Sequence, residues 1–178
     1  MTGPSHAGKS ATIAQVRRAL TSHTAVVAID DIIASFSLGE DDLWKHGLPA
    51  AYDVAIASAT ALLRRDFVVF VESTFTIVPP DGTRPMVHPE QLRRLIDAAE
   101  AADAPWLVVR LTSHAQELLR RREATGRLDP DVVQGTWRLH REWMPGIGMH
   151  ELDTAAMSPD QAAAALLEVF SGTATQGS

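Results

Sequence analysis

Short apolar runs alternate with longer amphipathic stretches along most of the chain. The apolar runs lie at residues 26–29, 67–71 and 106–109, with a weaker one at 149–152. Runs of this length without polar alternation are typical of strands that are buried on both faces of a sheet. Helical patterns occupy residues 9–20, 50–65, 89–102, 113–123, 131–143 and 159–170. The alternation predicts an α/β fold of three layers, in which a mostly parallel sheet is flanked by helices.

The bulk composition fits one globular domain. Of the 178 residues, 46% are hydrophobic and 21% are charged, which is ordinary for a domain with a sizeable core. We expect a single domain over residues 1–170 and a flexible tail over the small, polar residues 171–178. The net charge of −6 disfavours a nucleic-acid partner, because such partners usually meet a basic face. The absence of cysteine excludes disulfides and Cys-ligated metal sites.

The sequence also bears on location and assembly. No apolar run reaches the roughly 18 residues of a membrane-spanning helix, and the N-terminus lacks a charged-then-apolar signal pattern. We therefore expect a cytoplasmic protein without a membrane partner. The oligomeric state is left open by the sequence, and a homo-oligomer is compatible with it.

The clearest motif lies near the N-terminus, where residues 3–10 match the Walker pattern G-x-x-x-x-G-K-[ST] at every fixed position. In such loops, backbone N–H groups and the positive end of the following helix dipole face the phosphates. We expect Lys9 to bridge the β- and γ-phosphates of ATP and Ser10 to bind Mg²⁺. A chance match is the alternative, and the α/β pattern downstream argues against it. The expected ATP-binding residues are Gly3, Pro4, Ser5, His6, Ala7, Gly8, Lys9 and Ser10.

The strand that should precede this loop is not evident. A Walker loop normally connects a strand to a helix, yet only Met1 and Thr2 precede Gly3. Two residues are too few for a central strand of about five. The sequence therefore predicts a first strand that is missing or truncated, because the chain given begins late or because the protein folds without that strand.

Acidic residues follow three of the four apolar runs. Ligands of open α/β sheets bind at the carboxyl ends of the strands, so Asp30 is placed to take the proton from an acceptor hydroxyl. Asp30 and Asp31 also suit a helix N-cap, and we expect Asp31 to fill that role. Glu72 ends the second run in the manner of a Walker B acid that binds Mg²⁺, with a solvent-facing strand end as the alternative. Asp153 follows the last run and more simply predicts a turn.

The most basic stretch lies between residues 119 and 127. Arginine suits planar, bidentate contact with phosphate, but successive helical residues point in different directions, so at most one or two can reach a nucleotide. Arg122 and Arg127 flank the glycine turn at Gly126. They predict a mobile lid over about residues 120–130, whereas a solvated helix end is the alternative.

Four aromatic residues have two possible roles, in a pocket for the acceptor or in the hydrophobic core. A ring-bearing acceptor would stack on such side chains, although aromatics more often fill the core. The proline-containing segment 75–88 predicts a long loop after the Glu72 strand, and loops at that edge often cover substrate. The candidate aromatics are Trp44, Tyr52, Trp137 and Trp143.

Taken in order, several motifs resemble the chloramphenicol phosphotransferase-like branch of P-loop kinases. They are G-P-S-H-A-G-K-S, A-V-V-A-I-D-D-I-I, F-V-V-F-V-E-S-T-F, V-V-R-L-T-S, R-R-R-E-A-T-G-R and H-E-L-D-T. The resemblance spans the chain from Gly3 to about Phe170. It implies a five-stranded parallel sheet flanked by helices, as in nucleoside monophosphate kinases. It also implies that Asp30 is the base and that Arg122 and Arg127 are lid arginines around ATP.

Two features limit what this resemblance implies. The first strand is absent, and the segments 35–52 and 75–88 carry nothing that matches a chloramphenicol site. Polynucleotide 5′-kinases are similar in the same motifs but often carry an arginine shortly after the acid pair. Here Ile32, Ile33 and Ala34 follow that pair. The sequence therefore favours an ATP-dependent kinase acting on a hydroxyl of a small molecule. A regulatory nucleotide-binding protein without kinase activity and a polynucleotide 5′-hydroxyl kinase are the alternatives.

Overall fold

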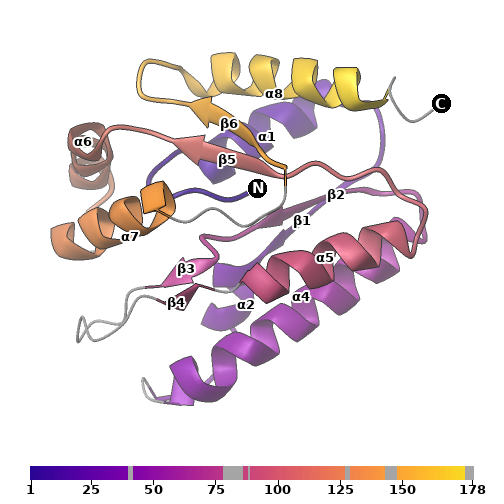
Figure 1. The fold of residues 1–178 in the computed structure, drawn as a ribbon, viewed down its shortest axis with the longest axis horizontal. Coiled ribbons are helices and arrows are strands. Elements are labelled where there is room, and N and C mark those ends of the chain that lie inside the picture. Colours follow the sequence, from indigo (N-terminus) through magenta and orange to yellow (C-terminus); the bar gives the residue numbers. More distant parts are fainter. Residues whose placement is uncertain (40–41, 78–85, 88, 127–128, 143–147, 175–178) are drawn as a thin grey trace. The chain divides into compact units, whose positions relative to one another are not determined.

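The computed structural model describes residues 1–39, 42–77, 86–87, 89–126, 129–142 and 148–174 (Figure 1). They belong to two compact units. The first unit draws on Met1–Ala19, Thr74–Pro89 and Leu107–Ser178, and the second on Leu20–Ser73 and Glu90–Trp106. Within the described ranges, no helix is both long and apolar enough to cross a membrane.

The first unit contains a parallel strand pair with helices packed around it. Strand β5 (Val109–Thr112) pairs with β6 (His150–Asp153), so that Thr112 lies opposite Asp153. Helix α1 (Lys9–Ala19) packs against α8 (Pro159–Ala174), and α6 (Ala115–Thr125) packs against α7 (Pro130–Glu142). A short antiparallel pair, β3 (Thr76–Ile77) with β4 (Met86–Val87), contacts α7 through β3.

The N-terminal residues enter this unit beside β5. Thr2 forms a single parallel bridge with Arg110. The Thr2 N–H donates to the carbonyl of Val109 at 2.8 Å, and the Leu111 N–H donates to the carbonyl of Thr2 at 2.9 Å. Strand pairing before the Walker loop is thus limited to one residue of the described chain. That bridge places the start of the loop next to the central part of β5.

The second unit is built on another parallel pair. Strand β1 (Thr24–Ala28) pairs with β2 (Val68–Glu72), and Ala28 lies opposite Glu72. Helix α2 (Ile29–Ala34) follows β1 directly, and a π-helical turn, η1 (Leu43–Gly47), leads into α4 (Leu48–Leu63). Helix α4 packs along β1, β2 and α2 through a buried stripe of small residues at Ala51, Ala55 and Ala59. Helix α5 (Pro89–Glu100) is joined to α4 by an ion pair between Arg94 and Asp53 at 2.8 Å.

The predicted α/β fold class is confirmed, and the six predicted helices are present with small shifts at their ends. The third strand was misplaced, because the observed strand is Val109–Thr112 and not residues 106–109. Trp106 is instead 38% exposed. Arg110 breaks the apolar pattern but is buried in the strand, where its Nη1 donates to the carbonyl of His140 at 2.7 Å and its Nη2 pairs with Glu151. Among the described residues, the parallel strands form two separate pairs rather than one hydrogen-bonded ladder.

His140 should make the stability of the first unit depend on pH. Burial is the main cause that lowers the pKa of this imidazole to about 3, and the positive charges of Lys9 and Arg110 contribute to the same shift. The folded protein therefore binds fewer protons than the unfolded chain between pH 6.5 and 3. The contribution of His140 to the free energy of unfolding is fully present above about pH 6.5. It falls with acidification by at most about 1.4 kcal/mol per pH unit.

We expect urea unfolding at pH 7.5 and pH 5.0 to reveal this loss. The His140→Gln variant should be less stable at pH 7.5 and should show a smaller difference between the two pH values. The exposed His46 supplies the matched control, His46→Gln, which should keep the wild-type difference. An unchanged pH difference in His140→Gln would show that other groups control acid unfolding.

Candidate functional site

Residues 3–10 form a tight loop between the Thr2 bridge and the start of α1. Gly3 and Gly8 have positive φ values of 143° and 93°, and His6 adopts a left-handed conformation with φ of 63°. The Ala7 N–H donates to the carbonyl of Pro4 at 3.2 Å, which closes a turn inside the loop. These conformations curl the backbone in front of the N-terminus of α1, as a phosphate-binding loop requires.

The side chain of Lys9 is held by the loop itself. Its Nζ donates to the carbonyl of Gly3 at 3.0 Å and to that of Pro4 at 3.1 Å, and the residue is buried. The positive charge is therefore fixed at the first turn of α1, where the helix dipole also favours an anion. Ser10, the next residue of α1, is exposed. This combination suits a ligand that carries several negative charges.

Gly3 is required by the close approach of the loop to β5. A Cβ atom on this residue would lie 2.4 Å from the carbonyl oxygen of Leu111, and the φ value would itself be strained. We expect Gly3→Ala to destabilise the protein by about 2–4 kcal/mol through the clash and the strain together. Thermal unfolding measures this loss. Gly148→Ala is the matched control, because a Cβ there meets nothing within 4 Å, and an equal loss in both variants would contradict the argument.

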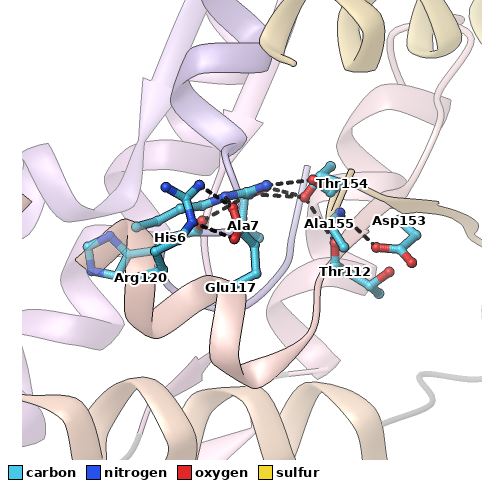
Figure 2. A network of polar contacts seen from close by, with 9 residues as sticks. His6, Ala7, Thr112, Glu117, Arg120, Asp153, Thr154 and Ala155 are labelled. Carbon is cyan, nitrogen blue, oxygen red and sulfur yellow. Dashed lines mark hydrogen bonds and ion pairs between the residues drawn. The ribbon is translucent and has the colours of Figure 1, made fainter. Parts of the chain in front are cut away.

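Arg121 connects the Walker loop to α6 and to the end of β6. Its Nε donates to Glu117 Oε1 at 2.8 Å, and its Nη1 donates to the carbonyl of His6 at 3.4 Å. Its Nη2 donates to the carbonyl of Thr154 at 2.5 Å. Figure 2 shows His6 and Ala7 of the loop on one side of this network and Thr154 on the other. A guanidinium group is thereby added to the charge of Lys9 at the loop.

Glu117 holds this arginine in place and pairs with a second one. Hydrogen bonds from Arg120 and then from Arg121 lower the pKa of the Glu117 carboxyl to about 2, so that it stays ionised near neutral pH. Arg120 is exposed and donates to Glu117 through Nε and Nη2, both at 2.7 Å. The Arg120 side chain therefore serves to anchor the carboxylate.

The arginine that contacts the loop is Arg121, whereas the sequence pattern had favoured Arg122 and Arg127. Arg122 lies in the last turn of α6, and Gly126 ends that helix in a left-handed conformation, as the glycine turn predicted. Arg127 lies outside the described residues, so the lid arginines remain a prediction. The spacing from Glu117 to Arg121 is the i,i+4 spacing of a helical ion pair. The spacing from Glu117 would have pointed to Arg121, whereas the position close to Gly126 favoured Arg122.

The two predicted strand-end acids lie together in the second unit. Glu72 ends β2 opposite Ala28, and Asp30 follows two residues later in the first turn of α2. Both therefore lie at the carboxyl end of the β1–β2 pair, as predicted, and Asp30 is exposed. The expectation that Asp31 caps the helix was wrong, because the N-cap position is Ala28 and no side chain caps it.

Tyr52 adds a buried hydroxyl to the same unit. Its Oη lies 3.0 Å from Ser73 Oγ, one residue beyond Glu72. Burial raises the pKa of Tyr52 to about 12, and the negative charges of Asp30 and Glu90 act in the same direction. The phenol therefore stays neutral and is placed by the same strand end that carries Glu72.

The other aromatic candidates contribute less. Trp137 donates its Nε1–H to the carbonyl of Ser113 at 3.0 Å and is stacked under Arg141, which indicates a structural role in α7. Trp143 and the side chain of Trp44 lie outside the described residues. The N-cap position of α6 is His114, and no side chain makes a capping hydrogen bond there.

The described residues contain no group of three or more acidic or histidine side chains that could cage a metal ion. A magnesium ion of the kind that P-loop proteins bind takes most of its ligands from phosphate oxygens and water. Ser10 is exposed at the start of α1, where its hydroxyl can serve such an ion.

Comparison with known proteins identifies the fold. No family model and no curated protein matches the chain. A provisionally assigned kinase from Chloroflexus aurantiacus has a similar structure, with 14% identity, a TM-score of 0.63 and coverage of 97% of this chain and 95% of that one. The APS kinase of Mycobacterium tuberculosis, solved with AMPPNP and APS, shares 17% identity with a TM-score of 0.60, covering 96% and 94%. The tunicamycin resistance protein of Deinococcus radiodurans shares 14% identity with a TM-score of 0.59, covering 96% and 93%. The chain therefore has the fold of P-loop kinases.

Proposed function

We propose that this protein is a phosphotransferase that moves the γ-phosphoryl group of ATP to a hydroxyl group of a small molecule. The observation that carries the proposal is the complete Walker loop, in which the ammonium of Lys9 is held at the carbonyls of Gly3 and Pro4 in front of a helix N-terminus. The likeness to P-loop kinase structures supports the choice of phosphoryl transfer over other uses of the loop.

The proposed reaction is a direct displacement at the γ-phosphorus. The acceptor oxygen forms a bond to phosphorus while the bond from phosphorus to the β–γ bridging oxygen breaks, which releases ADP. The proton of the acceptor hydroxyl goes to the carboxylate of Asp30, which is exposed at the end of the β1–β2 pair and is available for this role. Lys9 offsets the negative charge on the phosphates, and Arg121 adds a second cation at the loop.

Magnesium and the lid belong to the same proposal. Ser10 would hold the ion through its hydroxyl, and Glu72 would act through its carboxylate as a Walker B acid. When bound, Mg²⁺ offsets negative charge on the phosphate oxygens. Arg122 and Arg127 are proposed as lid residues that contribute further positive charge during transfer. A cytoplasmic location, where ATP is available, is proposed on the same ground.

ADP release with and without hydroxyl compounds tests the proposal. We expect slow ADP formation by the protein alone and at least a tenfold increase with the correct member of a panel of metabolites and antibiotics. A single-stranded oligonucleotide with a 5′-hydroxyl belongs in the panel, because stimulation by it alone would indicate a polynucleotide kinase. Tight nucleotide binding without stimulation by any compound would favour a regulatory nucleotide-binding protein.

A further inference from the structure

Thr154 lies at the junction of the Walker loop, β5 and β6. Its backbone N–H donates to the carbonyl of Thr112 at 2.9 Å, directly after the Thr112–Asp153 pair that ends the β5–β6 register. Its side-chain Oγ1 lies 2.9 Å from the carbonyl oxygen of Ala7 and 3.0 Å from that of Thr112. The residue is 3% exposed. A buried hydroxyl at this position must satisfy its proton within the protein.

The neighbouring contacts indicate where that proton goes. A hydroxyl donates one proton, and the carbonyl of Thr112 already accepts from the Thr154 N–H. Arg121 Nη1 donates to Thr154 Oγ1 at 3.3 Å, which occupies the acceptor side of the hydroxyl. Because the Thr112 carbonyl already has a donor, we assign the hydroxyl proton to the carbonyl of Ala7. Because the Arg121 guanidinium group donates to the Thr154 hydroxyl, the hydrogen bond from this hydroxyl to the Ala7 carbonyl becomes stronger.

Fixing the Ala7 carbonyl also fixes the next backbone N–H. The peptide between Ala7 and Gly8 is planar and trans, so its C=O and N–H point in opposite directions. The contact with Thr154 therefore turns the Gly8 N–H away from β6. The preceding peptide, between His6 and Ala7, is also held at both of its polar groups. Its carbonyl accepts a hydrogen bond from Arg121, and its N–H donates to the carbonyl of Pro4. Two successive peptide planes of the loop are thus oriented from outside.

We propose that Thr154 is a positioning residue for nucleotide binding, which orients the Ala7–Gly8 peptide so that its N–H is preset for a phosphate oxygen. The inference rests on the proposed function in that the ligand is a nucleoside triphosphate. Its physical basis is preorganisation, because a donor that is already oriented loses less freedom when the anion binds. Thr154 acts through the loop and makes no contact with the phosphate.

Two variants separate the hydroxyl from the rest of the side chain. Thr154→Val keeps the shape and removes the donor, whereas Thr154→Ser keeps the donor. Calorimetric titration with Mg-ATP should give about a tenfold higher Kd for Thr154→Val, the loss expected for one buried hydrogen bond. Thr154→Ser should stay within about threefold of the wild type. A Kd for Thr154→Val equal to that of the wild type would overturn the inference and leave the proposed function standing.

Hydrogen exchange tests, without any nucleotide, whether the Thr154 hydroxyl orients the Walker loop. In the protein without nucleotide, amide exchange in a peptide spanning residues 3–10 should be faster in Thr154→Val and restored in Thr154→Ser. Faster exchange across the whole first unit, or no change in this peptide, would show that the hydroxyl serves general stability and would overturn the inference. If the wild type binds no nucleotide, the proposed function fails, and the exchange result alone still tests whether Thr154 orients the loop.

Discussion

Replacing Lys9 with methionine is expected to weaken Mg-ATP binding and phosphoryl transfer together. Lys9 brings a full positive charge to the first turn of α1, and methionine keeps the apolar length of the side chain without it. Hydrogen bonds to charged groups contribute about 1.5–3 kcal/mol, so the Kd for Mg-ATP should rise by about 10- to 100-fold. Transfer should fall further, because charge on the phosphoryl oxygens grows in the transition state. Calorimetry measures the first effect and ADP release the second.

The chain offers a matched control for this variant. Lys45 is the other lysine of the sequence and is exposed in η1 of the second unit. Lys45→Met should leave both the Kd and the rate within about twofold of the wild type. Because Lys9 also donates to the carbonyls of Gly3 and Pro4, a thermal melt of Lys9→Met must show that the protein remains folded. Normal Mg-ATP binding by folded Lys9→Met would contradict the assignment of the loop.

Replacing Asp30 with asparagine is expected to abolish transfer while leaving Mg-ATP binding nearly intact. Asparagine has the shape of aspartate but cannot accept the proton of the acceptor hydroxyl at neutral pH. General-base catalysis contributes about 10²- to 10⁴-fold to a rate, and a loss of that size is the expected result. Single-turnover measurement of product formation, with ATP and acceptor at saturation, reports this loss without the contribution of substrate binding.

The adjacent aspartate gives the control. Asp31 is also exposed in the first turn of α2, so Asp31→Asn changes the charge of the segment by the same amount. We expect it to retain at least about a third of the wild-type rate. If Asp30→Asn and Asp31→Asn lose activity equally, the loss is caused by the reduced negative charge at the start of α2 and not by removal of a general base. Unchanged turnover in Asp30→Asn would remove Asp30 from the mechanism.

Local sequence pattern accounts for most of the elements and for the two acids. Apolar runs ending in Asp30 and Glu72 predicted parallel strands with acidic ends, and β1 and β2 place both residues at one carboxyl end. The pattern failed where a charged residue is buried. Arg110 reads as a polar interruption, but its Nη1 donates to the carbonyl of His140 and its Nη2 pairs with the carboxylate of Glu151 within the first unit. Such compensation depends on residues 30–41 positions away and leaves no local signal.

The surroundings of the Walker loop illustrate the same limit. The motif identified Lys9 and the two glycines, because their roles depend on backbone shape and charge within eight residues. It did not identify Arg121 or Thr154, which reach the loop from α6 and from the end of β6. Both contacts span more than 100 residues of sequence. Only the tertiary structure brings these side chains to the carbonyls of His6 and Ala7.

The fate of the γ-phosphorus of ATP shows whether the protein transfers this group to an acceptor. ATP labelled at that position is incubated with the wild type, Lys9→Met and Asp30→Asn in the presence of a compound that stimulates ADP release. If Lys9 and Asp30 act as proposed, the label appears in a phosphate ester of the compound with the wild type and in neither variant. Label found only as inorganic phosphate, or an ester formed equally by all three proteins, would contradict it.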